Sequence, residues 1–128
     1  MEISLRQVEV LNNTIQELLP LKLELSLAFQ LASLAREIHE AFDMLNTERT
    51  KIVTKYAKKD DNGQIVVDKE NNNMIEIPDE DVKKVDAELD ELFARKIELQ
   101  SNKIQLEAIK DLDLTVGQIE VLVPFIEK

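Results

Sequence analysis

Ligand-binding side chains are concentrated in one polar run, KKDDNGQIVVDK, at residues 58–69. Asp60, Asn62 and Gly63 stand where an EF-hand calcium loop has two ligands and its turn glycine. Ile65 stands at the apolar position of the same pattern. The first and twelfth positions are lysines, however, and a lysine at the twelfth repels the cation that a bidentate carboxylate normally binds there. We therefore interpret the run as a hairpin turn and predict no metal site.

The single histidine, His39, is the other candidate for metal or acid–base chemistry. It lies in a helical pattern with Asp43 one turn later, which is typical of a surface pair. The chain has no cysteine, so disulfides and thiolate metal sites are excluded. No histidine–acid–nucleophile set is present either. We predict that the protein is not an enzyme and has neither catalytic residues nor a cofactor.

Acidic side chains dominate the segment after Pro78, whereas residues 49–59 are basic and contain no acid. If the two segments form antiparallel helices, their charges pair across the contact and set its register, and this is the interpretation that we favour. The alternative is an exposed acidic face that mimics nucleic acid toward a host protein. This face consists of Asp79, Asp81, Asp86, Glu88, Asp90 and Glu91.

The spacing of apolar residues predicts the helices that carry these groups. A short helix over residues 4–19 begins with the capping-box pair Ser4 and Gln7. A long helix follows over 21–59, because apolar residues recur at intervals of three and four. Residues 21–27 also alternate as a strand does, but the pattern beyond them is helical, so we favour the helix.

The segment over residues 60–78 interrupts the helical pattern and predicts a β tip. Asn62-Gly63 is typical of a type I′ hairpin turn, in which both central residues need a positive φ. Short strand-like runs follow it, and the edges of a two-stranded hairpin are open to further pairing. We therefore predict that the apolar side chains of the tip form an interface with another copy or a partner. These residues are Ile65, Val67, Met74, Ile75 and Ile77.

The remainder of the chain is assigned to a returning helix over 79–95, a segment over 96–110 and a last short helix over 115–126. The middle segment alternates and is either extended or helical; we favour the extended form. The whole predicts one domain over 1–128 of mainly α class. Its architecture is an antiparallel long-helix hairpin with a small β-hairpin at its tip, plus short capping helices near both termini.

The returning helix is too short to cover the whole apolar stripe of the long helix. The uncovered Leu-rich end must be buried by residues 97–126 and the first helix, or by a second subunit, or by both. This demand favours an oligomer.

The segments SLRQVEVL, residues 4–11, and TVGQIEVL, residues 115–122, have nearly the same sequence. They are either twin binding elements for one ligand or two helices that need the same cap and the same apolar face. We favour the second interpretation, since capping boxes are common. This interpretation predicts that a set of apolar residues from the two helices is buried near Leu23–Leu34. This set is Val8, Leu11, Ile15, Ile119, Leu122 and Ile126.

Composition narrows the function classes. The chain has 128 residues, a net charge of −10 and 44% hydrophobic residues. A negative chain repels phosphate backbones, so nucleic-acid binding is disfavoured. No apolar run approaches the ~20 residues of a membrane span, and residues 1–10 lack the basic and apolar parts of a signal peptide. We expect a soluble, cytoplasmic protein that binds neither nucleic acid nor membranes.

Three stretches together resemble a family of small uncharacterised proteins encoded by tailed phages and prophages. They are KYAKKDDNGQIVVD, ELDELFARKIEL and LTVGQIEVLVPFIE. The sequence departs from this family at Val116, where the family has proline, and at Ala57, where it often has glycine. The family has no established activity, so the resemblance implies a phage context in a bacterial host cell and no site residues. The helix pair with a β tip is also similar in shape to prefoldin subunits, which carries no function by itself.

These features predict a non-enzymatic, phage-encoded accessory protein that acts through protein–protein contacts in a structural or assembly role. Its expected partners are itself, as a homo-oligomer, or another phage or host protein. The alternative is an acidic inhibitor of a host enzyme or defence protein.

Overall fold

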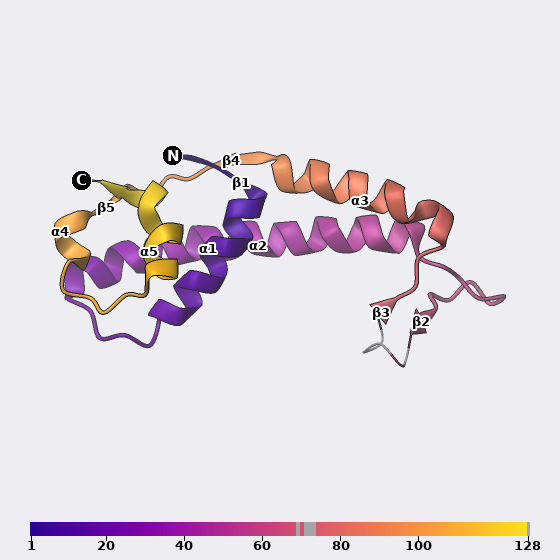
Figure 1. Ribbon diagram of the computed structural model, residues 1–128, viewed down its shortest axis with the longest axis horizontal. Coiled ribbons are helices and arrows are strands. Elements are labelled where there is room, and N and C mark those ends of the chain that lie inside the picture. Colours follow the sequence, from indigo (N-terminus) through magenta and orange to yellow (C-terminus); the bar gives the residue numbers. More distant parts are fainter. Residues whose placement is uncertain (69, 71–73, 128) are drawn as a thin grey trace. The chain divides into compact units, whose positions relative to one another are not determined.

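The computed structural model describes residues 1–68, 70 and 74–127 (Figure 1). It is mainly helical, with one long helix and small strand pairs, as the predicted mainly α class requires. The helices are α1 (Leu5–Leu18), α2 (Leu25–Tyr56), α3 (Asp79–Ala94), α4 (Leu106–Ile109) and α5 (Val116–Leu122), with a 3₁₀ turn η2 (Val123–Phe125). The strands are β1 (Glu2–Ser4), β2 (Val67–Asp68), β3 (Met74–Ile75), β4 (Lys96–Glu98), β5 (Ile104–Gln105) and β6 (Ile126–Glu127).

The contacts of the chain group into two compact units. Unit 1 comprises Met1–Asp43 and Lys96–Lys128, and unit 2 comprises Met44–Arg95. Helix α2 belongs to both, because it runs from Leu25 to Tyr56 without interruption. The single domain over 1–128 stays a prediction.

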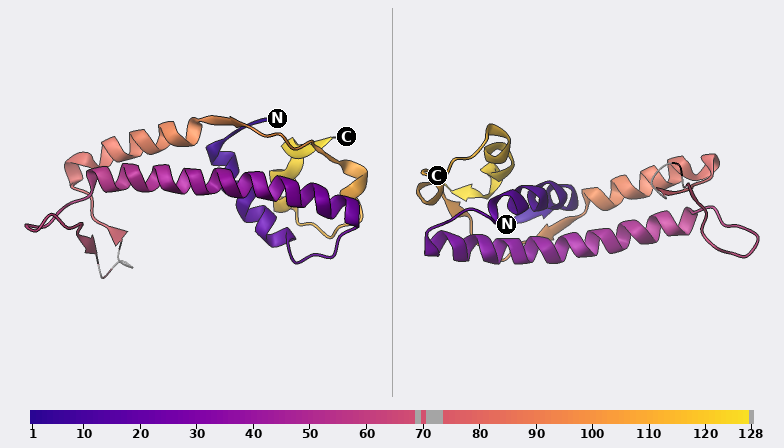
Figure 2. Two further views of the ribbon diagram at one scale, coloured as in Figure 1. Left: turned by 180° about the vertical axis from the view of Figure 1, so that it is seen from behind. Right: turned by 90° about the horizontal axis from the view of Figure 1, so that it is seen from below.

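Capping boxes begin two helices of unit 1, as the two similar segments over residues 4–11 and 115–122 predicted. The Ser4 hydroxyl accepts a hydrogen bond from Gln7 N, and Ser4 N donates to Gln7 Oε1. Thr115 and Gln118 make the same reciprocal pair at the start of α5. Helices α1 and α5 are also in contact (Figure 2). The near-repeat is therefore matched by two equivalent helix starts.

The segment over 96–105 binds both ends of the chain. Strand β4 pairs antiparallel with β1, with Ile97 opposite Ile3, and β5 pairs parallel with β6, with Ile104 opposite Ile126. The region over 96–110, for which extended and helical forms were both open, is thus two short strands followed by α4. The partners in the first pairing lie 94 positions apart and those in the second 22, so no local pattern indicates them.

The apolar face of α2 forms the centre of unit 1. Leu27, Leu31, Leu34 and Ile38 are each at most 7% exposed. The face of α1 that packs in this unit is buried too. Its residues Val8, Leu11 and Ile15 belong to the set that the two similar segments predicted to be buried, and all three are buried.

The C-terminal half of the same set is only partly buried. Leu122 is buried as predicted, but Ile119 is 44% exposed and Ile126 is half-buried in β6. Helix α5 ends at Leu122, and the following 3₁₀ turn, which contains Pro124, changes the direction in which successive side chains point. Phe125 therefore takes the core position in place of Ile126.

Helix α2 begins at Leu25 and not at residue 21. Its first turn is closed by the hydrogen bond from Ala28 N to Glu24 O. The chain leaves α1 through a turn in which Leu21 N donates to Leu18 O. Pro20 has no N–H to extend a helix through this turn, so residues 21–24 remain irregular. The alternation of their leucines belongs to this connection.

In unit 2, one ion pair joins the last turns of α2 to α3. Lys55 Nζ lies 3.1 Å from Glu88 Oε1. The hydrogen bond to Glu88 raises the pKa of Lys55, and the Tyr56 hydroxyl and Lys55 together lower the pKa of Glu88. The Arg49 guanidinium lies 5.5 Å from the centre of the Phe93 ring.

Two further ion pairs of unit 2 each lie within one helix. Lys51 bonds Glu48 on α2, and Lys84 lies 3.6 Å from Asp81 on α3. Side chains three residues apart on a helix are already neighbours, so these pairs form without the partner helix.

A ring of three backbone hydrogen bonds closes the segment between α2 and α3, which we call the tip. Lys58 N donates to Glu76 O, Glu76 N donates to Val66 O, and Val66 N donates to Lys58 O. Beyond this ring the chain makes one loop over residues 59–65 and another through β2 and β3, with Val67 opposite Ile75. Part of the predicted second turn, residues 69 and 71–73, lies outside the described residues. The backbone N–H and C=O of Lys58 both bond within this ring and are not available to a helix. Helix α2 therefore ends at Tyr56 and not at residue 59.

The first turn of the tip is displaced by one residue from the predicted type I′ turn. Gly63 N donates to Asp60 O, so Asp61 and Asn62 are the central residues, and Gly63 follows them with φ 79°. The Asp60 carboxylate accepts from Asn62 N and Gln64 N. The acid that matched a calcium-loop position therefore stabilises the turn itself.

Glu37 holds the bend between β4 and β5 against α2. Its carboxylate accepts hydrogen bonds from Gln100 N and Ser101 N, both at 2.7 Å, and from the Ser101 hydroxyl. Burial raises the pKa of Glu37, but the hydrogen bonds from Ser101 and Gln100 lower it by more, so its pKa lies below the ordinary value. The ionised carboxylate is therefore the form that stabilises this bend.

The two glycines of the chain should respond oppositely to alanine. Gly63→Ala should lower the free energy of unfolding by about 1 kcal/mol, because its φ of 79° is strained for any residue with a Cβ. Gly117→Ala should raise it by up to ~1 kcal/mol, because Gly117 lies inside α5 and the new Cβ has ordinary contacts. Urea denaturation of both variants measures the difference, and effects of the same sign would contradict it.

Glu37→Gln should lower the free energy of unfolding by about 1 kcal/mol at neutral pH, a value reduced for the partial exposure of the carboxylate. Because the folded-state pKa lies below the ordinary 4.5, this contribution is present above pH 4.5 and is lost as pH falls through the folded-state value. Urea titrations should therefore show the wild type and the variant converging in acid.

The matched control for this experiment is Glu40→Gln, since Glu40 makes only an exposed i,i+4 pair with Arg36. It should change stability little at either pH. A constant difference between wild type and Glu37→Gln across the acid range would show that the charge of Glu37 has no role.

Candidate protein-binding surface

The tip residues singled out from the sequence lie together in unit 2. Met74 is 58% exposed, Ile65 and Val67 are also exposed, and Ile75 and Ile77 are half-buried. The pairing of β2 with β3 places Val67 opposite Ile75. The tip thus presents apolar side chains, and its role as an interface stays a prediction.

The acidic residues of α3 are divided between exposed and partly covered positions. Asp79, Glu80, Asp86, Asp90 and Glu91 are exposed. The other two acids, Asp81 and Glu88, are half-buried and pair with Lys84 and Lys55. An exposed acidic stretch therefore remains on α3.

His39 lies on the surface of α2, where its Nε2 is 3.5 Å from Asp43 Oδ2. Within the described residues no group of three or more histidine, cysteine, aspartate or glutamate side chains is placed to hold a metal ion. In the same part of the chain, none of the helices is long and apolar enough to cross a membrane.

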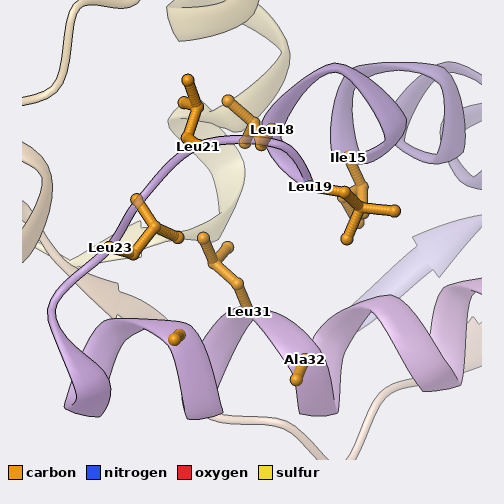
Figure 3. Close-up of a pocket in the computed structure, with 8 residues that line it drawn as sticks. Ile15, Leu18, Leu19, Leu21, Leu23, Leu31 and Ala32 are labelled. Carbon is orange, nitrogen blue, oxygen red and sulfur yellow. The ribbon is translucent and has the colours of Figure 1, made fainter.

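An apolar pocket of about 140 Å³ opens in unit 1, between the end of α1, the connection after it and the start of α2 (Figure 3). In the close-up, Leu31 of α2 points toward Leu18, Leu21 and Leu23 on the opposite side. The residues that line it are Ile15, Leu18, Leu19, Leu21, Leu23, Ala28, Leu31 and Ala32. Because none of these side chains has a polar group, the pocket suits an apolar occupant.

Local sequence explains why the pocket exists. Pro20 ends the helical path of α1, and the irregular connection then carries Leu21 and Leu23 over the first turns of α2. On α2 the facing positions include Ala28 and Ala32, whose small side chains leave space that a larger residue would fill.

Two large apolar side chains stand exposed beside the pocket. Leu25 is 71% exposed and Phe29, one turn later on α2, is 68% exposed. Leu19 and Leu21 at the pocket are exposed as well. We call the pocket with Leu25 and Phe29 the leucine surface. A clustered apolar surface of this kind is typical of a protein-interaction site.

Sequence reasoning identified the Leu-rich end of the long helix as needing a cover, but it did not identify Leu25, Phe29 or the pocket. The signal for these exposed side chains was the alternation of leucines over residues 21–27. A helix with this pattern cannot bury every leucine on one face. Elements of unit 1 bury Leu27, Leu31 and Leu34, and leave Leu25 and Phe29 uncovered.

Benzene should bind in the pocket, because an apolar cavity of about 150 Å³ in another protein takes up this molecule. The titration uses Phe29→Ala, because in this variant no phenyl ring of another copy can occupy the pocket, and chemical-shift changes of the leucine methyl groups measure the binding. Ala28→Leu should abolish these changes, since its added carbons occupy the pocket. The control Val116→Ser removes an apolar side chain that is 82% exposed on α5 and should leave them unaltered. Equal shifts in Phe29→Ala with and without Ala28→Leu would contradict the assignment.

Comparisons of the chain with protein-family models, with curated proteins and with solved structures found no match.

Proposed function

We propose that this protein is a non-enzymatic, phage-encoded accessory protein that acts through protein–protein contacts, in a structural or assembly role. The observation that carries the proposal is the leucine surface. Leu25 and Phe29 expose most of their area to water beside an apolar pocket. Leaving such side chains in water forgoes about 1.5–3 kcal/mol each relative to burial, and a partner that covers them recovers this energy.

The architecture of unit 2 suits the same role. The contacts of Lys55 with Glu88 and of Arg49 with Phe93 run in opposite chain directions along α2 and α3. They support an antiparallel helical hairpin that carries the β tip at its end, where the ring of backbone hydrogen bonds lies. In this arrangement Ile65, Val67 and Met74 form a second, smaller contact surface.

The setting of the protein follows from the resemblance to the phage family and from the net charge of −10. We place it in the cytoplasm of the bacterial host cell, with another phage or host protein, or its own copies, as partner. The negative charge disfavours nucleic acid and anionic membrane surfaces as partners. The proposal includes no enzymatic activity and no cofactor.

A second candidate function is an acidic inhibitor of a host enzyme or defence protein. The exposure of Asp79, Asp86, Asp90 and Glu91 on α3 favours it. Its partner would present a basic surface and its binding would weaken with salt, whereas binding through the leucine surface would change little with salt.

Affinity purification of the full tagged chain from host cells that carry the phage genes tests both functions. Leu25→Ser removes an exposed side chain of the leucine surface, and Asp86→Asn with Glu91→Gln neutralises part of α3. The proposed function expects a polypeptide, either an untagged copy of the chain or a different protein, whose recovery falls about tenfold in Leu25→Ser. The double α3 variant should retain it.

Loss of the partner only in the α3 variant would establish the inhibitor function instead. If no polypeptide distinguishes the wild type from Leu25→Ser, the proposed function is wrong. Both substituted sites are exposed, so circular dichroism of each variant should match that of the wild type.

A further inference from the structure

The pocket of the leucine surface matches a phenyl ring in size and chemistry. Its volume is about 140 Å³ and the side chains that line it are all apolar. A leucine- and phenylalanine-lined cavity of ~150 Å³ in another protein stays dry and binds benzene. The side chain that fits best is therefore phenylalanine, whose ring is the size of benzene and has no polar atom to leave unpaired.

A phenylalanine of this kind stands beside the pocket. Phe29 is 68% exposed, although aromatic rings contribute more than most side chains to the stability of interfaces when buried. At 100° per residue, Ala28, Ala32, Leu25 and Phe29 succeed one another around roughly 100° of the circumference of α2. The edge of the pocket and the exposed ring therefore lie on one continuous face of the helix.

A projection and a pocket on the same face are what a two-fold symmetric contact needs. In such a contact the same surface of each copy meets the other, so residue i touches j and residue j touches i. The ring of each copy enters the pocket of the other, and both exposed groups are covered at once. If the ring entered a different protein, the pocket of this chain would stay uncovered unless that protein supplied a ring of its own.

The charges next to the pocket also complement each other between copies. Lys22 and Glu24 are exposed and flank Leu23, which lines the pocket. When the same surface of two copies meets, Lys22 of each copy can approach Glu24 of the other, so the contact contains this pair of opposite charges twice. Like charges at these positions would oppose the same contact.

We propose that the leucine surface binds a second copy of this chain, with Phe29 of each copy inserted into the apolar pocket of the other. This inference rests on the proposed function, because it names the partner of the same surface. It assigns Phe29 as the anchor, Ala28 and Ala32 as the small residues that keep the pocket open, and Leu25 as the apolar rim around the inserted ring.

Light scattering on purified full chain, coupled to size-exclusion chromatography, is the first measurement. The wild type should be a dimer at tens of micromolar. Phe29→Ala removes the ring and Ala28→Leu fills the pocket, so each variant alone should raise the dimer dissociation constant at least tenfold. Val116→Ser, which changes an equally exposed apolar residue of unit 1, should not affect it.

The decisive step is to mix the two variants. Phe29→Ala retains an open pocket and Ala28→Leu retains the ring, so an equimolar mixture can form one ring-in-pocket contact that neither variant forms alone. The mixture should contain heterodimer, weaker than the wild type and detectable by native mass spectrometry. A general structural effect of either substitution would not be relieved by mixing.

A monomeric wild type at these concentrations would overturn the proposal, as would a dimer that both variants retain or a mixture without heterodimer. The proposed function fails separately. If the chain is monomeric but a different polypeptide is captured through Leu25, the function stands and this inference falls. If neither a dimer nor a captured polypeptide depends on the leucine surface, both fall.

Discussion

The apolar stripe of α2 is the constraint on which the rest of the structure depends. An isolated helix of 32 residues gains little stability from its own hydrogen bonds and must bury its apolar face to persist. The buried positions Leu27, Leu31, Leu34, Ile38 and Leu45 follow a helical spacing along both units. Each unit supplies a different cover: α1 and the terminal elements belong to unit 1, whereas α3 belongs to unit 2.

Covering the stripe with short pieces leaves many backbone groups that need partners. The capping boxes satisfy the first turns of α1 and α5, the Glu37 carboxylate satisfies Gln100 and Ser101, and three backbone bonds close the tip. Each device uses a few local polar atoms where a longer helix or sheet would use repeated backbone pairs. The polar residues that looked most suited to chemistry, such as Asp60, have this structural task.

Covering α2 with short elements also explains why the leucine surface remains open. Small elements cover Leu27 and Leu31, but the connection after Pro20 follows an irregular path and does not extend over Leu25 and Phe29. The result is an apolar pocket beside two exposed apolar side chains. A surface with this composition is unfavourable in water, which is why we assign the function of the protein to contacts made there.

Local sequence was sufficient for the features that local physics decides. The caps at Ser4 and Thr115 need residues three apart, the long helix needs a repeat of three and four, and the turn at Gly63 needs a positive φ. The mainly helical class could thus be predicted. Of the candidate surface, only the need for a cover at the Leu-rich end was foreseen.

Tertiary structure alone decided which segments meet and which side chains those meetings leave uncovered. The pairing of β4 with β1 and of β5 with β6 joins segments far apart in the chain through backbone groups that every residue has. Burial of Phe125 in place of Ile126, and exposure of Phe29 in place of Leu31, depend on the direction of a turn and the path of a connection. Apolar residues indicate which surface should be buried. The area that is actually buried depends on the shape of the elements that pack against it, and a sequence pattern does not contain that shape.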